Sequence, residues 1–295
     1  MIVVMGATGH TGRIITETLL KAGETVRALG RSAERLAPLR ELGAEVLAGD
    51  AGSATYLVKA FHGADRAYTL LPPDPQSIDF RAEQDRVGEA IVRAVKDSGV
   101  RHVVFLSSVG ADQKQGTGPI AGLHAQEERL RHLDGTHVLS LRAAFFFENF
   151  QATLPLIKHQ GINGGAIAPN LPVPMIASRD IAEVAAKALH TRSWNGRVVH
   201  ELLGERDLTH TEATQILGTR IGKPDLKYVQ FPYGDYAGAL VQAGLSQDMA
   251  GLYVEMAKAF NEGRAKSLEG RRPQNTTPTR FEDFADELAS AYRAL

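Results

Sequence analysis

The sequence contains no cysteine, so disulfide bonds, thiolate nucleophiles and cysteine-ligated metal sites are excluded. An excess of either charge is also lacking. The 33 basic and 34 acidic residues leave a formal net charge of -1, so neither a nucleic acid nor a membrane surface is expected as a partner. No apolar run approaches the roughly 20 residues that span a bilayer, and no signal peptide is recognised. We therefore expect a cytoplasmic location.

Patterns for metal binding and for nucleophilic hydrolysis are missing as well. The 10 histidines are scattered and form no HExxH spacing, so no metal site is expected. Ser107 lacks the GxSxG setting of a nucleophilic serine, and no Ser-His-acid set is indicated. The chain has 295 residues, of which 43% are hydrophobic, so it can still bury a sizeable core.

The first half alternates short apolar runs with stretches of helical spacing. We expect strands at residues 2–5, 25–29, 45–48, 67–71, 103–106 and 137–141, and helices at 13–22, 33–42, 53–61, 77–98 and 121–133. Such strict alternation predicts a parallel, doubly wound sheet with helices on both faces. Residues 1–150 are therefore expected to form a Rossmann-type α/β domain.

The alternation stops at a cluster of phenylalanines that begins at Phe145. A Gly- and Pro-rich span at 161–174 follows, then expected helices at 182–189 and 211–221, isolated strands at 198–203 and 226–231, and a mostly helical tail. Residues 151–295 are expected to form mainly a smaller α/β domain on the substrate side of a cleft. Some of its segments are expected to return to the Rossmann sheet.

Three glycines stand between the first expected strand and the first expected helix. Gly6 suits a conformation that other residues avoid, Gly9 allows close approach of a pyrophosphate, and Gly12 allows the helix to pack closely on the strand. Backbone N–H groups at the helix start bind such an anion. We expect Thr8, His10 and Thr11 to join the glycines in this site; the alternative is a plain tight turn.

The end of the second strand indicates which dinucleotide binds. NAD-specific folds place an acidic residue about 20 residues after the glycines, whereas here Gly30 and Arg31 stand at that place. A guanidinium group suits the 2′-phosphate of NADP, so Arg31 is expected to contact it. The alternative for Arg31 is a solvated surface arginine, which is how we interpret Arg27 and Arg35.

Two further segments are expected at the same crevice. Asp50 follows the third strand, where its carboxylate could accept a hydrogen bond from the adenine amino group; the alternative is a turn-forming Asp. Leu70, Leu71 and Pro72 follow the fourth strand. Ligands of open α/β sheets lie at the carboxyl ends of the strands, so these three residues are expected to form a wall of the cofactor cleft.

These residues resemble the NmrA-like family of atypical short-chain dehydrogenases. The matching segments are Gly6-Ala7-Thr8-Gly9 with Gly12, Val26-Arg27-Ala28-Leu29 with Arg31, Gly49-Asp50, Leu141-Arg142, Phe147-Glu148-Asn149-Phe150 and Arg179-Asp180-Ile181-Ala182. The tail is similar to that of the family's small NADPH-dependent quinone and dye reductases. The resemblance covers nearly the whole chain and implies a Rossmann fold with NADP(H) as cofactor. It leaves the substrate open.

The sequence lacks the usual pair of residues for proton transfer. No tyrosine has a lysine four residues later, so the pair that ordinary short-chain dehydrogenases use is absent. The resemblance implies that His124 and Glu128, one helical turn apart, replace that pair as catalytic residues. The alternative is a surface pair that only stabilises its helix. Ser107 and Ser108 are expected to line the nicotinamide.

The acceptor is expected to meet residues at the junction of the two halves. Phe145, Phe146 and Asn149 are the candidate substrate-lining residues, although core packing is the expected fate of most phenylalanines in this cluster.

Two functions remain open at this point. One is an NADPH-dependent reductase that transfers hydride to a small conjugated acceptor such as a quinone. The other is a redox sensor that binds NADP and reports to a protein partner without turnover. The sequence is compatible with a homodimer in either case.

Overall fold

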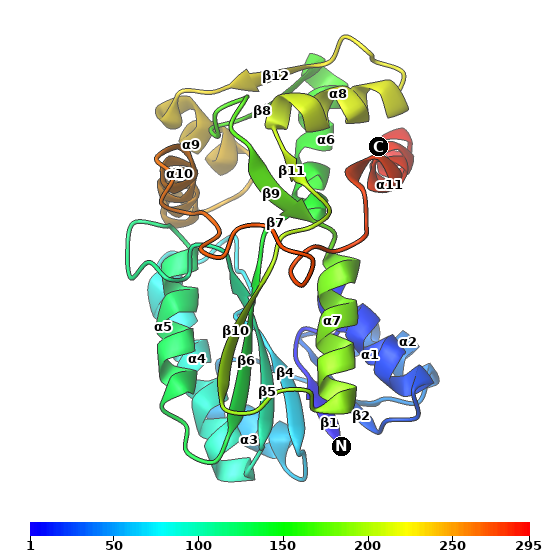
Figure 1. Ribbon diagram of the computed structural model, residues 1–295, viewed down its shortest axis with the longest axis vertical. Coiled ribbons are helices and arrows are strands. Elements are labelled where there is room, and N and C mark those ends of the chain that lie inside the picture. The colour runs from blue at the N-terminus through cyan, green and yellow to red at the C-terminus, as the bar shows by residue number, and fades with distance from the viewer.

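A parallel sheet of seven strands forms the centre of the larger half. The computed structural model describes all residues from 1 to 295, and the sheet has the order β3-β2-β1-β4-β5-β6-β10 (Figure 1). Its strands are β1 (Ile2–Val4), β2 (Val26–Gly30), β3 (Glu45–Ala48), β4 (Arg66–Thr69), β5 (His102–Ser108), β6 (His137–Ala143) and β10 (Arg197–Leu202). This arrangement confirms the Rossmann-type α/β fold.

Helices cover both faces of this sheet. One face carries α1 (His10–Lys21), α2 (Ala33–Glu41) and α7 (Ser178–Thr191), and the other carries α3 (Ala54–Phe61), α4 (Phe80–Ser98) and α5 (Ile120–Arg131). Strand β1 is apolar throughout because both of its faces are covered. Ile2 and Val4 face the first layer of helices and Val3 faces the second. A strand buried on both faces has no position for a polar side chain.

The order of the strands places a ligand site. Strand β1 pairs with β2 on one side and with β4 on the other. The chain reverses its direction of winding between β1 and β4. In open parallel sheets, ligands bind outside the carboxyl ends of the strands at such a switch point.

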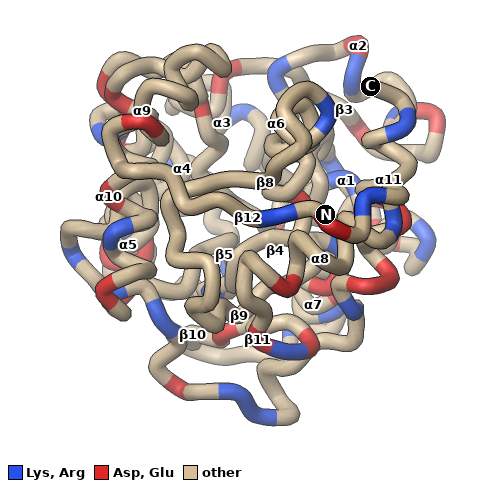
Figure 2. The backbone as a smooth tube through the Cα atoms, turned by 90° about the horizontal axis from the view of Figure 1, so that it is seen from above, with Lys and Arg blue, Asp and Glu red and all other residues tan.

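The remaining segments form a smaller half above that edge, which we call the cap. Its strands are β7 (Phe145–Phe146), β9 (Val173–Ile176) and β11 (Asp207–Leu208) in one small sheet, with β8 (Ile162–Gly165) and β12 (Lys227–Gln230) in another. Its helices are η1 (Phe147–Thr153), α6 (Leu154–Gln160), α8 (His210–Arg220), α9 (Tyr233–Gln242), α10 (Gln247–Asn261) and α11 (Phe281–Ala294). Figure 2 shows β8 and β12 side by side across the top of the cap.

The strands expected at 198–203 and 226–231 are present as β10 and β12, but they are not isolated. Strand β10 pairs in parallel with β6 and is the outermost strand of the main sheet, while β12 pairs with β8. Helix α7 also lies against the main sheet, where it packs beside α1 (Figure 1). Pairing between segments so distant along the chain leaves no local signal in the sequence.

The segment 262–280 crosses the junction between the two halves and is tied to the main sheet. Glu201 at the end of β10 is buried and accepts hydrogen bonds from the Ser267 hydroxyl and from the backbone N–H groups of Leu268 and Glu269. Further along, Thr279 donates to the Asp180 carboxylate at 2.6 Å. Buried carboxylates thus hold this segment in place.

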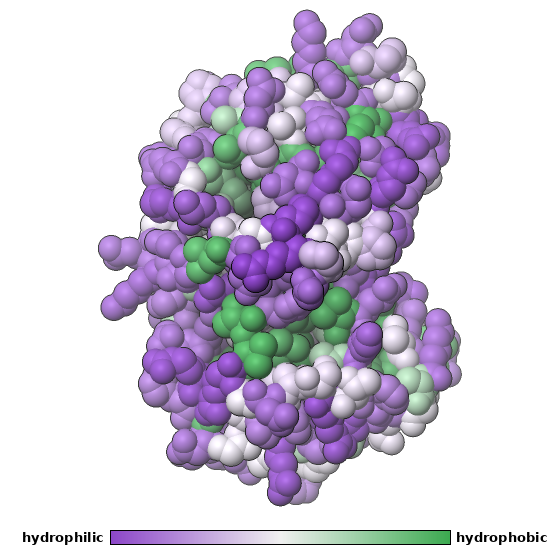
Figure 3. Space-filling model, in the orientation of Figure 1, coloured by the Kyte–Doolittle hydropathy of each residue, from purple (hydrophilic) through white to green (hydrophobic).

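The surface is polar apart from a few patches. Lysine, arginine, aspartate and glutamate are interspersed along the backbone (Figure 2). The free edge of β10 exposes Val198 and Val199, and Figure 3 shows hydrophobic side chains gathered over this strand. Among the helices, none combines the length and the apolar character needed to cross a membrane.

Candidate active site

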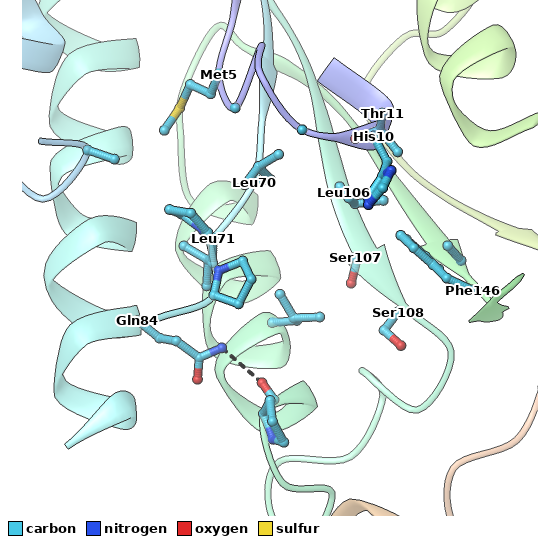
Figure 4. Close-up of a pocket in the computed structure, with 18 of the residues that line it drawn as sticks. Met5, His10, Thr11, Leu70, Leu71, Gln84, Leu106, Ser107, Ser108 and Phe146 are labelled. Carbon is cyan, nitrogen blue, oxygen red and sulfur yellow. Dashed lines mark hydrogen bonds between the residues drawn. The ribbon is translucent and has the colours of Figure 1, made fainter. Parts of the chain in front are cut away.

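One large cavity lies at the carboxyl ends of the central strands, beneath the cap. Its volume is about 580 Å³. The sequence-predicted residues that line it are Gly6, Thr8, Gly9, His10, Thr11, Arg31, Leu70, Leu71, Pro72, Ser107, Ser108, Phe145, Phe146 and Asn149. Figure 4 shows how residues of the glycine turn, of β5 and of the cap face one another across it. The cavity therefore joins the two halves of the molecule.

The glycine turn has the geometry that its sequence predicts. Gly6 has a φ of +62°, in the left-handed region that favours glycine. A Cβ atom on Gly12 would lie 2.3 Å from the carbonyl oxygen of Gly6. Only a glycine at position 12 therefore allows α1 to start so close to the end of β1.

Helix α1 begins at the cavity without a side-chain cap. Gly9 is its N-cap residue, and the first turn contains no acidic residue. In contrast, Ser32 and Ser53 cap α2 and α3 by accepting a backbone N–H. The N–H groups of His10 and Thr11, the first two residues of α1, have no partner within the helix, and both residues line the cavity. This end of α1 fits a bound pyrophosphate.

The three candidate arginines separate into two groups. Arg31 and Arg35 are exposed and line the cavity, both beyond the end of β2. Arg27 does not line it. Its guanidinium group donates to the Ala60 carbonyl at 2.6 Å and pairs with Glu45 at 2.9 Å, and its side chain is only 12% exposed. The expectation of solvated arginines is therefore wrong for Arg27, and Arg35 is a second cation beside Arg31.

Asp50 has the geometry of the turn-forming alternative. Its carboxylate accepts a hydrogen bond from the Gly52 N–H at 2.9 Å and pairs with Arg86 at 2.8 Å. Arg86 holds the pKa of Asp50 below its usual value. Gly49 and Ala51 line the cavity, but Asp50 between them does not. The interpretation of Asp50 as an adenine ligand stays a prediction, and the contacts of its carboxylate are those of the turn-forming alternative.

Apolar residues form the walls between the two ends of the cavity. Leu70 and Leu71 follow β4 and lie opposite Leu106 and the Ser107 side chain (Figure 4). Leu70 also packs on the glycine turn, since a Cβ atom on Gly6 would lie 2.9 Å from its Cδ2 atom. The backbone of the turn and the hydrophobic wall are therefore in direct contact.

The cap closes the other end of the cavity with aromatic residues. Phe145 and Phe146 line it, as does Asn149, while Phe147 and Phe150 are buried in the core of the cap. Helix α10 adds Tyr253, Met256 and Phe260 to the lining, a contribution that was not predicted from the sequence. Their spacing of three and four residues marks one helical face, but nothing in the sequence shows what that face covers.

His124 and Glu128 do not line the cavity. His124 Nδ1 lies 2.9 Å from the Ala111 carbonyl oxygen, and Glu128 pairs with Arg131 at 2.8 Å on the surface. The hydrogen bonds from Arg131 hold the pKa of Glu128 below its usual value. A catalytic role for this pair stays a prediction, and the cavity lining gives it no support. Only Glu128 has the geometry of the helix-stabilising alternative, through its pair with Arg131 on α5. His124 bonds instead to the segment before α5.

The neighbouring residue Glu127 faces inward instead. It accepts a hydrogen bond from the Ser107 hydroxyl at 2.5 Å and pairs with Arg142 through two contacts of 3.0 and 2.7 Å. The side chains of Glu127 and Arg142 are only 10% and 12% exposed. Burial lowers the pKa of Arg142, but the hydrogen bonds with Glu127 and the negative charges of Glu127, Asp112 and Glu201 together raise it. Glu127 thus contacts both a cavity-lining serine and a buried guanidinium group.

Positive charge is confined to one end of the cavity. Arg31 and Arg35 are the only lysine, arginine, aspartate or glutamate residues among those that line it. The end beneath the cap is lined by apolar and neutral polar residues. An anionic nucleotide therefore fits the first end, and a neutral, flat molecule fits the second.

Comparison with known proteins identifies the family. The model of the NmrA-like family matches residues 1–285. The chain belongs to the NmrA-like family.

Several proteins of known name are similar to this NmrA-like chain over nearly its full length. The (4-alkanoyl-5-oxo-2,5-dihydrofuran-3-yl)methyl phosphate reductase of Streptomyces griseus subsp. griseus is 29% identical over 99% of both chains. The NAD(P)H azoreductase of Xenophilus azovorans is 27% identical over 100% of both chains. Among solved structures, the NADPH-dependent quinone oxidoreductase of Escherichia coli in complex with NADPH has a TM-score of 0.80 and 23% identity, covering 98% of this chain and 99% of that one.

The tyrosines of this NmrA-like chain sit differently from those of ordinary short-chain dehydrogenases. Tyr56 and Tyr253 line opposite ends of the cavity, and each is followed four residues later by an alanine rather than a lysine. Burial raises the pKa of Tyr56 to about 12 and also raises that of Tyr253. Neither phenol has a nearby cation that would make it a stronger acid.

Proposed function

We propose that this protein is an NADPH-dependent reductase that transfers hydride to a conjugated small-molecule acceptor such as a quinone. The observation that carries the proposal is the continuity of the cavity. The same space runs from the uncapped start of α1 to the aromatic residues of the cap. A protein that only bound the nucleotide would have no use for an apolar chamber beside it.

The nucleotide end supplies binding and orientation. The first turn of α1 binds the pyrophosphate through backbone N–H groups, and Gly12 lets that turn approach the strand. Arg31 and Arg35 bind the 2′-phosphate through charge-assisted hydrogen bonds, which favours NADPH over NADH. When bound, the dihydronicotinamide supplies the hydride.

The cap end suits an electrophilic acceptor. Phe146 and the α10 residues Tyr253 and Met256 offer apolar and aromatic surface on which a flat ring can lie, with water excluded. Positioning of a strongly electrophilic acceptor beside the hydride supplies much of the rate acceleration. The names of the similar proteins, which refer to a dihydrofuranone phosphate, an azo compound and a quinone, support this class of acceptor.

The test is to follow the oxidation of NADPH by the purified protein with a panel of neutral quinones, azo dyes and enones. We expect oxidation that depends on the acceptor and is fastest with quinones. Tight binding of NADPH without oxidation by any acceptor would contradict the proposal. That result would favour the second candidate, a nucleotide sensor, which the absence of a Tyr-Lys pair also favours.

A further inference from the structure

The serine at the end of β5 is held by a buried ion pair. Ser107 lines the cavity and is only 3% exposed. Strand register places it directly beside Arg142 on β6, and Glu127 reaches both residues from α5. Two adjacent strands and one helix therefore determine where the Ser107 hydroxyl points.

This arrangement decides which hydrogen-bonding role is left to Ser107. A carboxylate paired with a guanidinium group can only accept hydrogen bonds, so the Ser107 hydrogen goes to Glu127. The Ser107 oxygen then offers only its lone pairs to the cavity. Ser108 is occupied in a similar way, because its hydroxyl donates to the Val109 carbonyl oxygen at 2.9 Å. Neither serine is left with a free hydrogen for a ligand.

We propose that Glu127 is a positioning residue that fixes the Ser107 oxygen as the acceptor of an N–H hydrogen bond from the nicotinamide carboxamide. The inference rests on the proposed binding of NADP(H) and extends it to residues outside the glycine turn. An N–H donor suits this position because an oxygen that has already given away its own hydrogen recognises donors and rejects acceptors.

The same assignment restricts the acceptors that can be reduced. The acceptor gains the hydride with its electron pair while the cofactor is oxidised, and the acceptor anion takes its proton from solvent water when it leaves the site rather than from Ser107. Acceptors that form a stable anion, such as quinones, meet this condition. Simple ketones do not, because their reduction needs a proton donor at the developing alkoxide.

The test compares binding of two nucleotides, NADP⁺ and 2′-phospho-ADP-ribose, which lacks the nicotinamide. Calorimetry is performed on the wild type, Ser107→Ala, Glu127→Gln and the double variant. We expect each single change to weaken NADP⁺ binding about five- to tenfold, with 2′-phospho-ADP-ribose unaffected. The double variant should bind NADP⁺ no more weakly than Ser107→Ala, because Glu127 acts through Ser107.

Removal of one charge from a buried pair can unfold a protein, so the variant Glu127→Gln/Arg142→Met, which removes both charges, is measured as well. It is expected to show the same loss for NADP⁺ only. Equal losses for both nucleotides, or losses that add in the double variant, would overturn the inference. So would a Ser107→Ala protein with unchanged NADP⁺ affinity and lower turnover, because Ser107 would then act on the acceptor. Binding is measured without an acceptor, so this test stands even if no acceptor is reduced.

Discussion

The Tyr68 hydroxyl donates a hydrogen bond of 2.9 Å to Oγ1 of Thr11, and both side chains are buried. This hydrogen bond links β4 to the first turn of α1. We expect Tyr68→Phe to lower the free energy of unfolding by about 1 kcal/mol and to weaken NADP⁺ binding, because that turn is held less firmly. The control is Tyr228→Phe, which removes a 2.9 Å bond to Ile167 within the cap. Equal losses of NADP⁺ affinity in the two variants would contradict this role.

The close contact of Gly12 with the Gly6 carbonyl predicts that Gly12→Ala abolishes nucleotide binding. The new methyl group has to displace the backbone of the turn, since its place is 2.3 Å from that oxygen. Gly251→Ala is the matched control, because α10 leaves open space there. It should raise the stability by up to about 1 kcal/mol. Isothermal calorimetry and thermal unfolding separate the two effects, and normal binding by Gly12→Ala would refute the prediction.

The position of Arg31 at the cavity predicts a change in cofactor preference. Loss of a charge-assisted contact to the 2′-phosphate should weaken NADPH binding by Arg31→Ala at least tenfold, on the order of 1.5–3 kcal/mol, with NADH binding little changed. Arg13→Ala removes an arginine that pairs with Glu17 away from the cavity and should leave both affinities unchanged. If NADPH and NADH lose affinity equally, Arg31 does not contact the phosphate.

The place of His124 outside the cavity predicts that it is dispensable for chemistry. We expect His124→Ala to keep the wild-type turnover with a quinone, at a small cost in stability from the lost contact with Ala111. Steady-state kinetics provide the measurement. A fall in turnover at unchanged nucleotide affinity would restore His124 as a catalytic residue.

The buried imidazole of His210 predicts a loss of stability in acid. Burial lowers the pKa of His210 to about 4, and its Nδ1 atom has no partner. An unfolded histidine has a pKa of about 6.5, so between these values the unfolded chain binds more protons and stability falls as the pH falls. The loss approaches about 3 kcal/mol near pH 4.

The corresponding experiment compares urea unfolding between neutral pH and pH 4.5. His210→Leu should flatten the loss of stability in acid, because the ring is surrounded by Phe145, Phe150 and Tyr228. His62→Leu, the same change at an exposed histidine, should not flatten it. Parallel acid profiles for the wild type and His210→Leu would show that His210 does not control them.

The central sheet was largely predictable from the sequence because most of its strands are buried on both faces. Residues 103–106 illustrate this, since a short continuous apolar run is typical of a strand in a sheet that helices cover on both faces. Strand β10 does not follow that pattern. It is an edge strand with Val198 and Val199 exposed and Glu201 buried. Its pairing with β6 could therefore not be predicted from its sequence pattern.

The cavity residues likewise divide into those that the sequence predicts and those that only the tertiary fold reveals. Turn residues such as Gly6 and Arg31 follow strands whose ends are recognisable, and their positions follow from topology. Glu127 was overlooked, although Leu123 and Leu130 on the same helix indicate which face turns inward. Residues spaced four and three apart share a face, so position 127 belongs with those leucines. The position of Phe260 in the cavity wall depends on how the cap folds, so it could not be predicted from the sequence.

The composition of the cap core has a consequence for the order of folding. That core combines Phe147 with Phe281 and Leu288 of α11, whereas the last strand of the main sheet ends at Leu202. As the chain emerges from the ribosome, all seven strands are available long before the cap can close. A nascent chain therefore completes the nucleotide wall first. The core of the cap is complete only once α11 has been made.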